Sequence, residues 1–243
     1  MTSPKVKIFA NAEAVADSFA GDLYLLVKQT EAPVHIALSG GTTPALLFDI
    51  LARDYAEKMD WSKIHFWWGD ERCVPPTDAQ SNYKMTVDHL LSNIEMPAGN
   101  IHRVKGERAP EDANSDYIAE ISQHLPFKNN LPVFNLIILG MGNDGHTASI
   151  FPHELELLND PNICAVATHP ESGQKRVSLT GKVINNALEV SFLVTGTSKT
   201  ERVREIFNHL SESEQLPSTY IRPTHGNLNF YFDQAAAAGI KTS

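Results

Sequence analysis

A carboxylate and an imidazole lie two positions apart in a glycine-rich segment, and together they could move a proton. The segment LGMGNDGHTASIFP, residues 139–152, places Asp144 and His146 directly after an apolar run at 133–139. Such a run is typical of a strand buried in a parallel sheet, and open α/β sheets bind ligands at the carboxyl ends of their strands. Because histidine titrates near neutral pH, we expect acid–base chemistry here. The structural alternative is a turn in which Asp144 caps a helix and His146 is merely exposed.

A second glycine-rich turn could hold a phosphate. The sequence SGGTTP lies between an expected strand and an expected helix and begins with Ser39, Gly40, Gly41 and Thr42. Unpaired N–H groups and the helix dipole favour an anion at a helix N-terminus. The turn matches neither GxGxxG nor a Walker loop, so we expect neither a dinucleotide nor ATP. A plain tight turn with a threonine cap is the structural alternative.

Four charged residues could complete the same site. Asp70 and Arg72 belong to GDER, which directly follows the aromatic run IHFWW, and Arg176 and Lys199 lie near the ends of later expected strands. Arginine offers forked donors that fit a phosphate. We therefore expect Arg176 and Lys199 to approach the phosphate, and Arg72 to bind it or to polarise a carbonyl. Asp70 could orient a sugar hydroxyl, although a structural ion pair would also explain GDER.

Length and composition narrow the class of protein. The chain has 243 residues, of which 42% are apolar and 20% charged, and its net charge is −9. The negative charge argues against a general nucleic-acid or anionic-membrane binder. No apolar run is long enough to span a membrane and no signal-peptide core precedes the first strand, so we expect a cytoplasmic protein. Cys73 and Cys164 are expected to be free thiols, and the ten histidines form no HExxH or HxH pattern, so no metal site is expected.

Strands and helices alternate along most of the chain. This order predicts right-handed βαβ units and a mainly parallel sheet with helices on both faces. We expect a Rossmann-like, doubly wound α/β fold in a single domain, residues 1–243, with a (β/α)8 barrel as the second choice. Expected strands lie at residues 5–10, 35–38, 64–68, 133–139, 164–168, 176–180 and 188–195, with shorter ones at 101–104 and 230–232. Asn11 is expected to cap the first helix.

The motifs SGGTTP, WWGDERCVPPTDAQSNYKM, LGMGNDGHTASIFP and RVSLT, in this order, resemble the 6-phosphogluconolactonases of the glucosamine-6-phosphate isomerase/6-phosphogluconolactonase family. The resemblance extends from about Ser39 to the alanines near the C-terminus. It implies a Rossmann-like fold shared with glucosamine-6-phosphate deaminase and ribose-5-phosphate isomerase. It also implies hydrolysis of 6-phosphoglucono-δ-lactone to 6-phosphogluconate in the oxidative pentose phosphate pathway, without a cofactor. The expected partner is this small-molecule lactone, and we expect a monomer or weak homodimer.

Roles for individual residues follow from the matching motifs. The resemblance implies that His146 is the general base. Asp70, Arg72 and Asp144 would line the substrate site. The phosphate would be held by the 39–42 turn together with Arg176 and Lys199. For the oxyanion formed when water attacks the lactone, Arg72 or a backbone N–H near Gly142 is a candidate donor.

Two other functions remain open. The deaminase motif resembles DGHIAFNEP, with a glutamate five places after the histidine, whereas this chain has Phe151 there. The carboxylate that ring opening and isomerisation would use is therefore absent, which favours lactone hydrolysis over a sugar-phosphate isomerase or deaminase. A non-catalytic sugar-phosphate sensor would keep the 39–44 turn and Lys199 but would not need His146.

Overall fold

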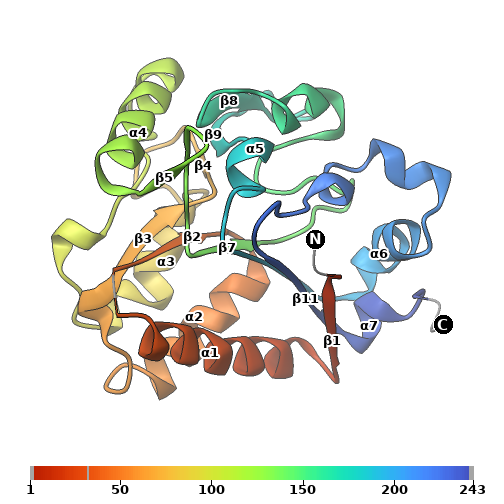
Figure 1. The fold of residues 1–243 in the computed structure, drawn as a ribbon, viewed down its shortest axis with the longest axis horizontal. Coiled ribbons are helices and arrows are strands. Elements are labelled where there is room, and N and C mark those ends of the chain that lie inside the picture. Colours follow the sequence, from red (N-terminus) through yellow and green to blue (C-terminus); the bar gives the residue numbers. More distant parts are fainter. Residues whose placement is uncertain (1–2, 32, 241–243) are drawn as a thin grey trace.

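A six-stranded parallel sheet forms the centre of the molecule. The computed structural model describes residues 3–31 and 33–240. Neighbouring strands follow the order β1-β11-β10-β7-β2-β3, and every pair is parallel (Figure 1). The strands are β1 Lys5–Phe9, β2 Val34–Leu38, β3 Ile64–Trp68, β7 Leu136–Leu139, β10 Glu189–Val194 and β11 Asn227–Asp233.

Helices cover both faces of this sheet, with α1 and α2 on one side and α4 on the other (Figure 1). Asn11 caps α1 as predicted, because its side chain accepts a hydrogen bond from the Ala14 N–H at 2.9 Å. None of the helices in the described ranges is long and apolar enough to cross a membrane. The α-helices are α1 Ala12–Gln29, α2 Thr42–Asp54, α3 Asn82–His89, α4 Pro110–His124, α5 Gly181–Ile184, α6 Thr200–Phe207 and α7 Gln234–Ala237.

Successive residues of a strand enter opposite cores, which explains why the strands read as continuous apolar runs. Trp67 packs in one core beside Ala37, and Trp68 packs in the other beside Leu38, and all four are almost fully buried. The predicted α/β fold with a parallel sheet covered on both faces is therefore confirmed. The barrel alternative is wrong, because β1 and β3 are the two edges of an open sheet.

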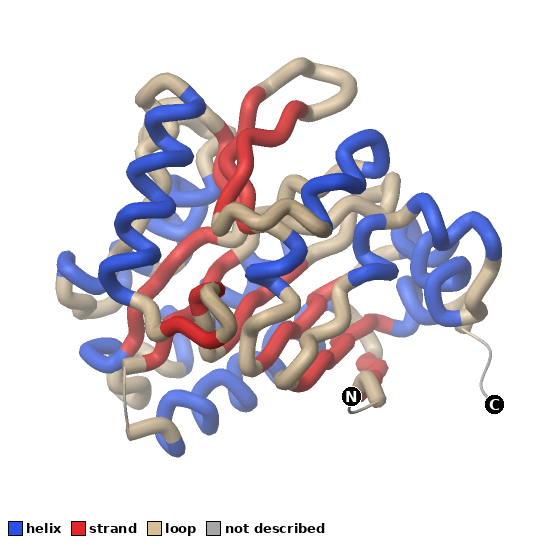
Figure 2. Tube along the Cα trace, turned by 45° about the horizontal axis from the view of Figure 1, so that its top comes forward, coloured by secondary structure: helices blue, strands red, loops and turns tan. Residues whose placement is uncertain are grey.

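Two of the expected strands do not join the main sheet. β8 Cys164–Thr168 and β9 Lys175–Leu179 form a hairpin, and β4 Asp70–Arg72 pairs with β9 to complete a separate antiparallel sheet (Figure 2). The expected strand at 101–104 is reduced to one bridge between Ile101 and Phe66. A further two-residue pair, β5 Phe127–Lys128 and β6 Leu131–Pro132, was not expected from the sequence.

His35, near the start of β2, makes stability depend on pH. It is 7% exposed, and its Nδ1 accepts a hydrogen bond from Trp67 Nε1 at 3.2 Å. Burial, with the nearby His65, lowers the pKa of His35 to about 4. Between pH 6.5 and pH 4, His35 is therefore protonated in the unfolded chain but not in the folded chain. The free energy of unfolding falls as pH falls through this range.

We expect the His35→Asn variant, which keeps an acceptor for Trp67, to lose less stability on acidification. The difference in the free energy of unfolding should amount to about 2 kcal/mol between pH 7 and pH 5. Urea denaturation of both proteins at the two pH values measures it. Equal losses in the two proteins would show that His35 does not titrate on unfolding.

Candidate active site

His146 and Asp144 form a hydrogen-bonded pair in the turn that follows β7. His146 Nδ1 lies 2.6 Å from Asp144 Oδ1, and the His146 backbone N–H donates to the same oxygen at 3.1 Å. The His146 carbonyl accepts a hydrogen bond from the Gly142 N–H at 2.9 Å, and the ring packs against Phe151. The turn thus fixes the imidazole from both its side chain and its backbone.

The contact with Asp144 also determines which nitrogen of the His146 ring carries the proton. Burial opposes the charge of Asp144, but the hydrogen bonds and the charge of His146 outweigh it and lower the pKa of Asp144 to about 2. An ionised carboxylate only accepts hydrogen bonds, so Nδ1 of His146 carries the proton. The lone pair of the neutral ring is then on Nε2, which is the form that a general base requires.

Two arginines lie side by side in the small antiparallel sheet. Arg72 of β4 is the direct register partner of Arg176 of β9. The Nε of each guanidinium is buried and has no hydrogen-bond partner among the residues that the structure describes. Arg72 Nη1 donates to the carbonyl of Gln80. Two adjacent cations with unused buried donors are suited to an anion that carries two charges.

Asp70 and its neighbour Glu71 have different surroundings. Asp70 is 5% exposed, accepts a hydrogen bond from Ser149 Oγ at 2.6 Å and lies 3.9 Å from Arg176 Nη1. Glu71 instead accepts the backbone N–H groups of Asn82 and Tyr83 at 2.8 and 2.7 Å. Burial raises the pKa of Glu71, and these N–H donors act against that rise. Asp70 therefore faces the arginines, whereas Glu71 anchors the first turn of α3.

The 39–42 turn approaches its neighbours closely. Gly41 precedes α2 with φ 109°, a conformation that favours glycine. A Cβ on Gly40 would lie 1.9 Å from Asn82 Oδ1, so only glycine fits beside that side chain. Asn82 is itself held by a 2.9 Å hydrogen bond from Nδ2 to the Asp70 carbonyl. The first N–H groups of α2, from Thr42 onward, are without helical partners and remain available to an anion.

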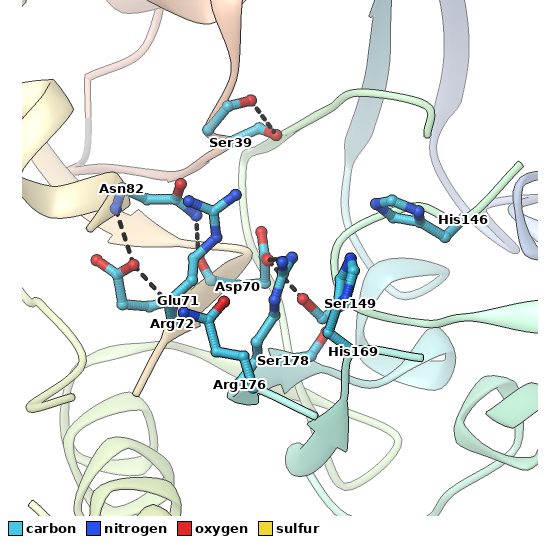
Figure 3. Close-up of polar contacts among 12 residues, drawn as sticks. Ser39, Asp70, Glu71, Arg72, Asn82, His146, Ser149, His169, Arg176 and Ser178 are labelled. Carbon is cyan, nitrogen blue, oxygen red and sulfur yellow. Dashed lines mark hydrogen bonds and ion pairs between the residues drawn. The ribbon is translucent and has the colours of Figure 1, made fainter. Parts of the chain in front are cut away.

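These groups line one polar pocket of about 200 Å³. This is smaller than the roughly 300–1,000 Å³ of drug-sized pockets and suits a small polar ligand. In Figure 3, Arg72, Asp70 and Arg176 lie together, and His146 lies across from them. Of the predicted site residues, the lining includes Ser39, Gly40, Gly41, Asp70, Arg72, His146 and Arg176.

Three predicted site residues lie outside this lining. Asp144 contacts the imidazole of His146, and Thr42 is exposed at the start of α2. Lys199, in a short 3₁₀ turn before α6, donates from Nζ to Asn143 Oδ1 at 2.6 Å. Burial lowers the pKa of Lys199, and the charge of Asp144 acts in the opposite direction. Lys199 is thus held beside the His146 turn.

Sequence reasoning missed several residues of the pocket wall. Asn82 and Ala148 line the pocket, and Ser149 donates to Asp70. Ala148 has φ 48°, a conformation that costs about 1 kcal/mol or more for a residue with a Cβ. Asn82 lies within the motif WWGDERCVPPTDAQSNYKM, but nothing in that stretch indicates that its side chain meets the 39–42 turn. The strain at Ala148 is visible only in the backbone.

The closeness of Gly142 to the His146–Asp144 pair gives a direct test of that pair. A Cβ at position 142 would lie 2.1 Å from His146 Nδ1 and 2.6 Å from Asp144 Oδ1, so the pair must move. We expect Gly142→Ala to lower kcat at least about 10-fold, since small misplacements of catalytic groups are costly. Gly99→Ala is the matched control, because a Cβ there meets no atom within 4 Å. Steady-state kinetics of the two variants measure the effect. Full activity of Gly142→Ala would contradict a catalytic role for the His146–Asp144 pair.

Comparisons with known proteins show the family and the fold of this chain. The sequence profile described as "Glucosamine-6-phosphate isomerases/6-phosphogluconolactonase" matches residues 10–230. A 6-phosphogluconolactonase of Haemophilus influenzae is 44% identical over 229 residues, which is 94% of this chain and 96% of that protein. The crystal structure of a devB protein superposes with a TM-score of 0.92 at 47% identity, covering 98% of this chain and 99% of the other. A monomeric glucosamine-6-phosphate deaminase, 18% identical, shares the fold with a TM-score of 0.81 over 97% of this chain and 99% of its own.

Proposed function

The chain belongs to the glucosamine-6-phosphate isomerase/6-phosphogluconolactonase family, and on this premise we propose that it hydrolyses 6-phosphoglucono-δ-lactone to 6-phosphogluconate. Its activity is that of the 6-phosphogluconolactonases, which are carboxylic ester hydrolases of carbohydrate metabolism. The reaction would serve the oxidative pentose phosphate pathway. The observation that carries the mechanism is that His146 and the Arg72–Arg176 pair line one pocket from different sides.

The proposed reaction begins with a water molecule held by His146. Nε2 takes a proton from the water, the hydroxide attacks C1 of the lactone, and a tetrahedral oxyanion forms. The C1–ring oxygen bond then breaks, and the imidazolium returns its proton to the leaving alkoxide. Asp144 keeps Nδ1 protonated and stabilises the imidazolium, as the 2.6 Å contact supports. Each step uses only groups of the chain and water.

The proposed phosphate site is opposite His146. Arg72 and Arg176 supply two positive charges and their unused Nε donors, and the N-terminus of α2 adds the N–H groups of the 39–42 turn. Asp70, at 3.9 Å from Arg176, orients that guanidinium. Lys199 would reach the phosphate by leaving Asn143. Binding energy from the phosphate would align C1 with His146.

This arrangement bears on three alternatives that the sequence left open: the oxyanion donor, the role of Arg72, and hydrolysis as opposed to deamination. The Gly142 N–H is engaged with the His146 carbonyl, so that N–H is not free to stabilise an oxyanion. Arg72 lies beside Arg176 rather than beside His146, which supports phosphate binding over carbonyl polarisation. Phe151 packs against His146 where a deaminase would need a carboxylate, and this favours hydrolysis over deamination.

A coupled assay tests the activity. Glucose-6-phosphate dehydrogenase generates the lactone, and acid release is followed with and without the protein, since the lactone also hydrolyses spontaneously. We expect the protein to increase the rate in proportion to its concentration. Ammonia release from glucosamine 6-phosphate would instead support a deaminase. Tight binding of 6-phosphogluconate without any increase in rate would support a sensor.

We also propose a cytoplasmic location and a monomer or weak homodimer. Cys164 is buried and Cys73 half-buried, and both are free thiols, as is usual in a reducing compartment. Light scattering at several concentrations measures the assembly.

A further inference from the structure

Four histidines gather at the other end of the strands from the pocket. His35 and His65 lie near the starts of β2 and β3, and their rings are 4.9 Å apart. His102 joins them because its N–H donates to the Phe66 carbonyl, and His124 comes from the end of α4. At a rise of ~3.3 Å per residue, the start of β3 lies about 13 Å from its carboxyl end. The cluster is therefore separate from the site described above.

Three side chains in this cluster have the spacing of metal ligands. One nitrogen each of His102 and His124 and a carboxylate oxygen of Glu120 all lie within 4.8 Å of one another. His102 Nδ1 is 2.8 Å from Glu120 Oε1, and this separation needs to widen only to about 3.4 Å for the two atoms to bind one tetrahedral ion with bonds of ~2.1 Å. Glu120 and His124 are four residues apart on α4, so they share one face of that helix.

In both His102 and His124, a hydrogen bond to one ring nitrogen orients the ring. His124 Nδ1 is 2.9 Å from the Glu120 carbonyl, which can only accept, so this nitrogen is protonated and Nε2 carries the lone pair. His102 Nε2 lies 2.9 Å from His65 Nδ1. Metal-binding histidines almost always have such a partner on the other ring nitrogen.

Burial and exposure also suit a bound cation. The side chain of His102 is 2% exposed, whereas those of Glu120 and His124 are 43% and 31% exposed. An ion can therefore enter from solvent and keep water molecules on its open side.

We propose that His102, Glu120 and His124 bind a divalent transition-metal ion such as Zn²⁺. Two imidazoles and a carboxylate are ligands that Zn²⁺ accepts, whereas Mg²⁺ and Ca²⁺ prefer oxygen. The ion would tie α4 to the segment at 101–102, which lies beside β3. Helix α4 in turn packs on β8 and on β9, which carries Arg176. The sequence patterns could not reveal this site, because its ligands come from two separate segments.

Zinc titration of the full chain tests the proposal. The His146→Gln variant is the reference protein, so that the active-site pair cannot contribute a site. We expect one Zn²⁺ per chain by calorimetry at about pH 7.5, and a rise of several degrees in Tm at saturation. Cu²⁺ should quench tryptophan fluorescence, because the Trp67 ring stacks on His102 at 4.0 Å.

Surface substitutions make the test specific. His124→Gln and Glu120→Gln change partly exposed side chains, and each should weaken Zn²⁺ binding at least about 10-fold. His89→Gln removes another partly exposed histidine beside a carboxylate, Asp49 at 2.8 Å, and should leave binding unchanged. Binding that is equal in all four proteins, or no Zn²⁺ binding in the reference protein, would overturn the proposal and leave the cluster as a hydrogen-bonded packing feature.

Discussion

Replacing His146 with glutamine is expected to lower kcat by about 10²–10⁴-fold and to leave KM within about threefold. Glutamine has similar length and polarity, but its amide cannot take a proton from water. The phosphate end of the pocket is untouched, so binding of the lactone should persist. Initial rates in the coupled assay, corrected for spontaneous hydrolysis, give both constants. A variant with near wild-type kcat would show that another group activates the water.

The neighbouring Asp144 allows a second comparison with the same assay. Asp144→Asn removes the carboxylate that holds Nδ1 protonated, and its effect on kcat should be smaller than that of His146→Gln. The double variant should be no slower than His146→Gln alone, because Asp144 acts through the imidazole. Additive losses would indicate that Asp144 contacts the substrate independently. His89→Gln, on the exposed end of α3, is the control for an ordinary histidine substitution.

Local patterns predicted the main sheet and the turn that carries His146, because each is encoded by short continuous stretches of the sequence. The run at 133–139 predicted β7, and the glycines after it predicted a turn that displays Asp144 and His146. The separate sheet of β4, β8 and β9 was missed, since alternating apolar residues do not tell which sheet a strand joins. The register that sets Arg72 opposite Arg176 depends on contacts between distant parts of the chain.

Side-chain partners were the least predictable part of the site. GDER offered three charges for one crevice, but Glu71 is turned to the first N–H groups of α3, and only the folded position of that helix explains this. Lys199 was expected at the phosphate on the basis of its place after β10, and the sequence did not indicate that its Nζ donates to Asn143. The hydrogen-bond partner of a long side chain depends on which groups lie near it in the folded protein, and the sequence does not show this.

Arg176→Gln is expected to raise KM for the phosphorylated lactone by about 10–100-fold, with a smaller effect on kcat. A hydrogen bond to a charged group contributes about 1.5–3 kcal/mol, and the loss also removes one of the two positive charges near the dianion. Lys175→Gln is the matched control, because Lys175 is the exposed neighbour on β9 and donates to Thr168 outside the pocket. Equal KM values for both variants would remove Arg176 from the phosphate site.

Substrate preference distinguishes a phosphate-binding role of Arg176 from a purely structural one. Arg176 is 8% exposed and faces Asp70, so its loss also unpairs a buried carboxylate and will lower stability. A structural defect would lower kcat/KM equally for 6-phosphoglucono-δ-lactone and for the unphosphorylated lactone. Loss of a phosphate contact lowers it for the phosphorylated substrate alone. Arg176→Lys, which keeps the charge near Asp70 but loses the forked donors, should fold better and show the same selective loss at a smaller size.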